Sequence, residues 1–173
     1  MIKLEMKMKL NWMEKYLRDA ESMITDDRVE EGLALLNNLL YEEPGYGGLH
    51  NHLGWAYLYY TEDVLRAELH LKMAIKFDES YVPPYLHIGA LYMRQARYSD
   101  VISYSEAGLA KANNHTALLQ NLAYAYEMRK DWSMAIRAYK KAMATSVLDF
   151  EVNNLISGIK RCRKKRAVLF FGL

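Results

Sequence analysis

Apolar side chains recur three, four and seven positions apart along most of the chain, with polar side chains between them. This period places the apolar positions on one face of an α-helix. The pattern predicts eight successive helices and a ninth near the end, over residues 12–25, 29–42, 46–60, 63–77, 82–95, 99–111, 115–129, 133–145 and about 149–165. We therefore expect an all-α protein.

Local signals mark two of the predicted helix starts. Asn11 followed by Glu14 forms a capping-box signal, which predicts that the first helix begins at residue 12. Pro83 and Pro84 suit the first turn of the fifth helix, where a backbone N–H has no partner within the helix. Both signals fall at boundaries that the apolar period predicts independently.

A short motif repeats along the chain: an aliphatic residue, a small residue, any residue, a small or aliphatic residue, and a tyrosine. Three segments carry it: Leu53–Tyr57, Ile88–Tyr92 and Leu122–Tyr126. The small residues Gly54, Gly89 and Ala123 are 35 and 34 positions apart, and a fainter copy places Ala20 34 positions before Gly54. The longer interval reflects one extra residue near positions 61–63. A fixed period of this length indicates a tandem repeat.

The repeat resembles the tetratricopeptide repeat, a helix-turn-helix unit of 34 residues. The resemblance covers about residues 12–145, which would form four tandem units. It implies a right-handed α-solenoid of antiparallel helix pairs, whose small residues let neighbouring helices approach closely. The implied parts are an N-terminal extension over 1–11, flexible or helical; repeats over about 12–45, 46–80, 81–114 and 115–148; a capping helix with a basic end over 149–166; and a short apolar tail over 167–173.

The resemblance also implies where a partner binds. In tetratricopeptide arrays, the first helix of each unit lines a concave groove on the face away from its leucine and tyrosine anchors. Here that face carries aromatic, methionine, amide and other side chains: Asn51, His52, Trp55, Leu58, Tyr59, Leu86, His87, Met93, Arg94, Gln120, Asn121, Tyr124, Glu127 and Met128. Rings and amides suit an extended or helical peptide. Two alternatives stay open: some rings pack between helices, or the protein's own tail fills the groove.

The charges are unevenly distributed. The formal net charge is +2, but residues 160–166 hold six basic groups and residues 1–10 hold three lysines and one glutamate. The segment between them, residues 11–159, therefore carries a net charge of −6. Nucleic-acid binding over the fold needs a continuous basic stripe, so we expect no nucleic-acid partner.

The C-terminal segment combines two patterns. Val152, Leu155, Ile156 and Ile159 have helical spacing, which predicts a helix that caps the last repeat. The basic run that follows, and the apolar residues Ala167–Leu173, have three interpretations: a solvated helix end, an anchor on anionic lipid, or the start of a membrane helix in a longer chain. A membrane surface is thus a candidate partner through Lys160 to Leu173. We expect folding to need the cap but not residues 160–173.

The candidates for chemistry are few. His52 and His87 occupy equivalent repeat positions, but no carboxylate or cysteine completes a ligand set, so we expect no metal and no other cofactor. Cys162 lies among basic groups, which favour its thiolate, yet no histidine follows it, and we expect an incidental exposed thiol. No phosphate-binding glycine loop is present in the sequence. These features do not predict an enzyme.

The sequence therefore predicts a non-catalytic protein–protein interaction module, an adaptor or scaffold that binds a peptide segment of a partner. A single cysteine and the lack of an export-signal pattern favour the cytoplasm, with membrane association at the C-terminal end as a variant. Two alternatives remain: a secretion-type or export chaperone, and a membrane-tethered assembly factor.

Overall fold

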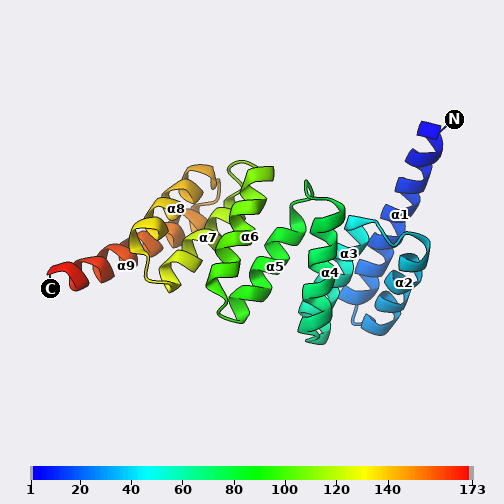
Figure 1. Ribbon diagram of the computed structural model, residues 1–173, viewed down its shortest axis with the longest axis horizontal. Helices are drawn as coiled ribbons and strands as arrows, with labels where there is room; N and C mark the ends of the chain where they lie inside the picture. Colours follow the sequence, from blue (N-terminus) through cyan, green and yellow to red (C-terminus); the bar gives the residue numbers. More distant parts are fainter. Residues whose placement is uncertain (1, 172–173) are drawn as a thin grey trace. The chain divides into compact units, whose positions relative to one another are not determined.

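The structure, a computed structural model, describes the backbone of residues 2–171 and the side chains of residues 12–169. These residues form helices that follow one another along the chain, and no strand occurs among them. In order they are α1 (Ile2–Thr25), α2 (Val29–Glu42), α3 (Gly47–Ala56), the π-helical turn η1 (Tyr57–Thr61), α4 (Val64–Phe77), α5 (Pro83–Arg94), α6 (Tyr98–Lys111), α7 (Thr116–Met128), α8 (Trp132–Thr145) and α9 (Asp149–Phe171) (Figure 1). The predicted all-α fold is confirmed.

Two helices are longer than the apolar period predicts. Helix α1 begins at Ile2, so the capping-box prediction at Asn11 is wrong. Residues 2–10 are mostly lysine, methionine, leucine and glutamate, which are good helix formers, and the helix continues through them. Helix α9 extends to Phe171 for the same reason, since neither glycine nor proline occurs between Gly158 and Gly172.

Contacts divide the chain into two compact units, Met1–Pro84 and Tyr85–Leu173, which we call unit 1 and unit 2. Unit 1 holds α1 to α4. In it, α1 packs on α2, α2 contacts α3, and α3 packs on α4. Unit 2 holds α5 from Tyr85 onward and α6 to α9. In it, α6 packs on α7, α7 on α8, and α9 lies against both α8 and α7.

Small residues permit the close helix contacts within each unit. A Cβ atom added at Gly54 of α3 would lie 2.6 Å from Cγ of Leu71 in α4. A Cβ atom at Gly158 of α9 would lie 2.7 Å from Cζ of Tyr139 in α8. Such distances leave no room for a larger side chain, which explains why glycine occupies the contact positions.

The π-helical turn accommodates the extra residue of the second repeat. It spans Tyr57–Thr61, directly after α3 and directly before the positions where the sequence is one residue longer. A single wider turn is the usual way for a helix to take up an inserted residue. Glu62 then adopts a left-handed backbone (φ 59°), and the Asp63 side chain accepts a hydrogen bond from the N–H of Arg66 at the start of α4. The Gly54–Leu71 contact is kept despite the insertion.

The predicted capping face of α9 contacts the rest of unit 2. Leu155 and Ile159 are buried, and Val152 and Ile156 are half-buried. The buried face continues one turn further, because Cys162 is fully buried. Cys162 is therefore not the exposed thiol that its basic neighbours suggested.

Candidate functional site

Unit 2 contains an open groove of about 510 Å³ between α7 and α9. Four of the residues predicted for the peptide-binding groove line it, together with residues of α8 and α9. The lining residues are Met93, Gln120, Asn121, Tyr124, Tyr139, Phe150, Glu151, Asn154, Leu155, Ser157 and Arg161. The repeat resemblance directed attention to the α5 and α7 residues, and it gave no indication that α9 forms the other side.

The α7 side of the groove combines amides with an exposed ring. Tyr124 lies four positions after Gln120 and three after Asn121, so both amides neighbour its ring on the helix surface. Gln120 and Asn121 are half-buried, and the Tyr124 side chain is 42% exposed. Met93, from α5, is half-buried beside them. A large ring next to hydrogen-bonding amides is an arrangement that can hold a peptide.

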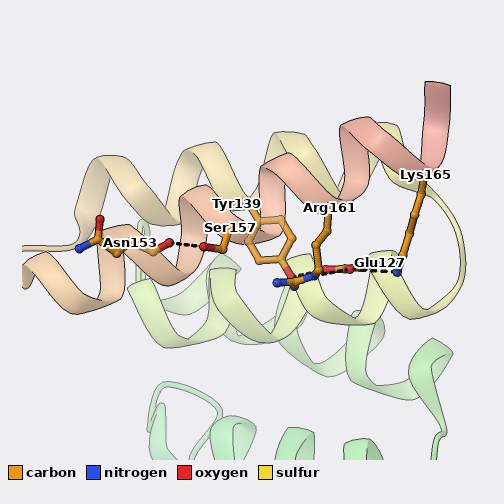
Figure 2. A network of polar contacts seen from close by, with 6 residues as sticks. All are labelled: Glu127, Tyr139, Asn153, Ser157, Arg161 and Lys165. Carbon is orange, nitrogen blue, oxygen red and sulfur yellow. Dashed lines mark hydrogen bonds and ion pairs between the residues drawn. The ribbon is translucent and has the colours of Figure 1, made fainter. Parts of the chain in front are cut away.

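Glu127, another residue of the predicted binding face, has a different role. Its side chain is 4% exposed, and its carboxylate accepts hydrogen bonds from Arg161 Nε (3.0 Å) and Arg161 Nη2 (2.8 Å). The Tyr139 hydroxyl donates a third at 2.7 Å, and Lys165 Nζ lies 3.4 Å away (Figure 2). The expectation that Glu127 contacts a peptide is therefore corrected, because its carboxylate is buried and already paired. We call these four residues the Glu127 network.

The hydrogen bonds of the Glu127 network shift the pKa values of its carboxyl and hydroxyl groups. Burial alone would raise the pKa of Glu127, but the hydrogen bonds from Arg161 and Tyr139 outweigh it and lower that pKa to about 2. Burial and the hydrogen bond to Glu127 raise the pKa of the Tyr139 hydroxyl, which stays protonated as a donor. The carboxylate thus remains charged at any physiological pH.

The network also argues against the expectation that folding does not need residues 160–173. Arg161 and Lys165 belong to the basic run that we expected to be unnecessary for folding, yet both contact Glu127. Lys165 Nζ also lies 5.1 Å from the centre of the Trp132 ring. Burial raises the pKa of the Cys162 thiol to about 11, although its basic neighbours lower it. The structural part of α9 therefore reaches at least Lys165.

The predicted residues of unit 1 fall into two groups. Asn51 and Leu58 are 5% and 4% exposed, so they belong to the core and their side chains do not form an open surface. Trp55 is half-buried, with its ring centre 4.9 Å from that of Tyr60, and Tyr59 is 42% exposed. The prediction of an aromatic binding face in unit 1 thus rests on Trp55 and Tyr59.

The predicted histidines lie in different units. His52 lines a second groove, of about 420 Å³ in unit 1, with its Nδ1 2.8 Å from the Gly48 carbonyl oxygen and its Nε2 3.7 Å from a Glu21 carboxylate oxygen. His87 is half-buried in unit 2. The remaining predicted residues lie outside the α7–α9 groove: Leu86 is half-buried, and Arg94 and Met128 are exposed.

A second buried polar centre lies in unit 1. The Nδ1 atoms of His50 and His70 are 2.9 Å apart, and His50 Nε2 is 2.9 Å from the Pro44 carbonyl oxygen. A carbonyl can only accept, so His50 Nε2 carries a proton and the two Nδ1 atoms share one more. Burial lowers the pKa of His70 to about 4, with smaller effects from His50 and Arg66. The His70 imidazole is therefore neutral at pH 7.

Solved structures of MamA and of a TPR protein have the same fold. A crystal structure of MamA superimposes with a TM-score of 0.68 at 19% identity, covering 80% of this chain and 75% of that one. MamA from Desulfovibrio magneticus RS-1 superimposes with a TM-score of 0.65 at 16% identity, covering 89% of this chain and 95% of that one. A thermophilic TPR protein of Thermus thermophilus superimposes with a TM-score of 0.67 at 20% identity, covering 83% of this chain and 79% of that one.

These likenesses establish the class of fold. The chain is a tetratricopeptide-type helical repeat, as the 34-residue period predicts. No protein-family model and no curated protein sequence matches the chain. Stacked helix pairs of this class form extended concave surfaces. None of the helices within residues 2–171 is both long enough and apolar enough to cross a membrane.

Proposed function

We propose that this protein is a non-catalytic adaptor or scaffold that binds a peptide segment of a partner protein in the α7–α9 groove. The observation that carries the proposal is the exposed Tyr124 ring in a groove that also offers the Phe150 ring and several amides. Aromatic anchors supply most of the binding energy at protein interfaces, and amide side chains can pair with a peptide backbone.

The test captures binding partners with the wild-type protein. The affinity of a captured segment is then measured for wild type and for Tyr124→Ala. Truncation of a central aromatic anchor commonly costs about 2 kcal/mol, so binding should weaken roughly 30-fold. Tyr41→Ala is a matched control, because Tyr41 is 87% exposed on α2 and lies outside the groove. Equal affinity of wild type and Tyr124→Ala would overturn the proposal, provided that both variants keep their helicity by circular dichroism.

The proposed cellular setting is the cytoplasm. The one cysteine is buried with a raised pKa, which suits a protein that uses no disulfide bond. An export chaperone would use the same groove for a client segment, so Tyr124→Ala tests that alternative as well. We propose no nucleic-acid partner, because residues 11–159 carry a net charge of −6, whereas phosphate binding over the fold needs a continuous basic stripe.

A second candidate function is attachment of α9 to an anionic membrane surface. Its exposed cations outside the Glu127 network are Lys160, Arg163, Lys164 and Arg166. Val168 and Leu169 follow them, 47% and 68% exposed. Cations beside exposed apolar side chains favour a lipid surface over a nucleic acid, since only lipid offers both charge and an apolar layer.

Sedimentation with anionic and neutral liposomes tests the attachment. We expect binding to anionic liposomes at low salt, loss of binding at high salt, and weaker binding of Leu169→Asp. Binding that is equal on neutral liposomes, or unchanged in Leu169→Asp, would count against the membrane candidate.

A further inference from the structure

One stripe of α9 residues forms a complete side of the α7–α9 groove. Phe150, Asn154, Ser157 and Arg161 are four, three and four positions apart, so they share a face of the helix, and all four line the groove. Eleven residues of α-helix span about 16 Å. The chemistry changes along this length, from an aromatic ring through an amide and a hydroxyl to a guanidinium.

The Phe150 end of the groove exposes apolar side chains and has one acidic side chain next to them. Phe150 is 63% exposed, and Val147 and Leu148, which lead into α9, are 91% and 47% exposed. This much exposed apolar area in one place is typical of a binding surface. Glu151 also lines the groove here, with its carboxylate accepting a hydrogen bond from the Ser146 hydroxyl.

The Arg161 end carries a fixed positive charge. Glu127 accepts from Nε and Nη2 of Arg161, which holds the guanidinium plane in position, and Nη1 takes no part in that pairing. The Arg161 side chain is 50% exposed, whereas Glu127 is buried. Lys165 brings a second cation to the same carboxylate, so the three groups together have an excess of one positive charge. A guanidinium already held in place binds a carboxylate at little cost in conformational entropy.

The middle of the groove suits an extended backbone. Asn154 lies on the α9 side, with Gln120 and Asn121 on the α7 side. Their amides can pair with the free N–H and C=O groups of an extended peptide, whereas a bound helix satisfies those groups internally. About five extended residues, at roughly 3.3 Å each, cover the 16 Å between the two ends.

We propose that the groove binds an extended segment in one direction. A large apolar side chain of the segment lies at the Phe150 end, and the carboxylate of an Asp or Glu side chain, four or five positions away, pairs with Arg161. The reverse direction would place the carboxylate beside Glu151, where like charges repel. This inference rests on the proposed function and adds the chemistry and polarity of the ligand.

The test is a display library of random eight-residue segments held inside a carrier protein, so that no segment has a free end. It is selected in parallel on wild type, Arg161→Gln and Arg163→Gln. Arg163→Gln is the matched control, since it removes one exposed cation two residues away that does not line the groove. A chosen segment is then measured with its acidic residue changed to the corresponding amide.

We expect wild type and Arg163→Gln to enrich segments with an acidic residue four or five positions from a large apolar one, always in the same order. Arg161→Gln should keep the apolar preference and bind the acidic segment at least about tenfold more weakly, in line with the loss of one charge-assisted hydrogen bond. On Arg161→Gln, the acidic segment and its amide form should bind equally.

Arg161→Gln also removes a partner of Glu127, so folding needs a control of its own. The double variant Arg161→Gln/Glu127→Gln leaves no buried unpaired carboxylate and should show the same loss of acidic preference. A Glu151→Gln variant should accept the segment in both orders, because the charge that opposes reversal is gone.

The outcomes separate the two proposals. If wild type enriches no segment, the proposed peptide-binding function fails. If segments are enriched without the acidic residue, or if the acidic preference survives in both Arg161 variants, the peptide-binding function stands and the assignment of Arg161 is overturned. A second library, displayed with free C-termini, is selected in parallel on wild type. Enrichment from that library alone would overturn the assignment to an acidic side chain.

Discussion

Each unit of this protein contains a buried polar centre built from paired side chains, and these two centres have opposite character. In unit 1 the His70 ring, which pairs with His50, is neutral, because burial disfavours its imidazolium form. In unit 2 the Glu127 network is ionic, since three donors outweigh the burial of the carboxylate. A buried polar group thus stays neutral where its partners are few and becomes charged where its partners are strong donors.

The two centres also join different parts of the repeat. His50 and His70 lie on α3 and α4, the two helices of a single repeat, and their rings stack at 5.2 Å. Glu127 lies on α7, whereas Arg161 and Lys165 lie on the capping helix α9 (Figure 2). The histidine pair therefore stabilises one repeat internally, while the ionic network attaches the cap to the last repeat.

The largest expected effect is that of cutting the chain inside the network. Removal of residues 160–173 takes away Arg161, Cys162 and Lys165 and leaves Glu127 with only the Tyr139 hydroxyl. Loss of one side of a buried ion pair costs about 3–5 kcal/mol. The melting temperature should fall by roughly 10 °C, at about 2–4 °C for each kcal/mol in a protein of this size.

Removal of residues 167–173 alone is the matched control, because it keeps all four members of the network. Its melting temperature should stay within a few degrees of wild type. Equal losses from the two truncations would show that the network does not attach the cap.

The second-largest expected effect is a difference between the two units in how their stability responds to acid. The folded state lowers the pKa of His70 from 6.5 to about 4, so the unfolded state binds more protons below pH 6.5 and unit 1 loses stability as the pH falls from 6.5 to 4. Glu127 has its pKa lowered from 4.5 to about 2, so its contribution is present above pH 4.5 and is lost between 4.5 and 2. At pH 5, the titration of His70 should have lowered the free energy of unfolding of unit 1 by up to about 2 kcal/mol. The titration of Glu127 should have changed that of unit 2 by almost nothing.

Hydrogen exchange read by mass spectrometry can follow both units in one sample. After correction for the intrinsic pH dependence of exchange, protection in α3 and α4 should drop between pH 7 and pH 5 more than protection in α7 and α8. His70→Phe, which cannot titrate, should remove the difference. An unchanged acid response in His70→Phe would assign it to another group.

Sequence alone predicts the helices but not these centres. The apolar period and the 34-residue repeat predict the helices of the repeats because burial of apolar faces dominates the fold. The capping face was predictable from Leu155 and Ile159 for the same reason. The period could also have been followed further, since Cys162 and Lys165 are seven positions after Leu155 and Gly158, on the same side of the helix.

The pairing itself depends on distant residues. Arg161 and Glu127 are 34 positions apart, and no local signal distinguishes Arg161 from Arg163 beside it. The resemblance assigned Glu127 to the binding face because it considered repeats alone, without a capping helix against that face. The same holds for the groove. The repeat pattern predicts its α7 residues, but its α9 residues are known only once the packing of the capping helix is known.

The smallest expected effect compares a glycine contact in each unit. Gly54→Ala brings a methyl group to 2.6 Å from Leu71 Cγ, and Gly158→Ala brings one to 2.7 Å from the Tyr139 ring. Both changes gain up to about 1 kcal/mol of helix propensity and lose about 1–3 kcal/mol to overpacking. Leu71 is fully buried and its backbone N lies 3.1 Å from the added methyl group, so the contact at Gly54 is also tight. The tyrosine ring is in addition held by its hydrogen bond to Glu127, so movement of the ring also weakens the ionic network. Gly158→Ala should therefore cost about 1 kcal/mol more than Gly54→Ala in urea denaturation. Adding Tyr139→Phe, which removes the hydroxyl and keeps the ring, should bring the two glycine costs together, whereas an unchanged gap would mean that the hydrogen bond does not fix the ring.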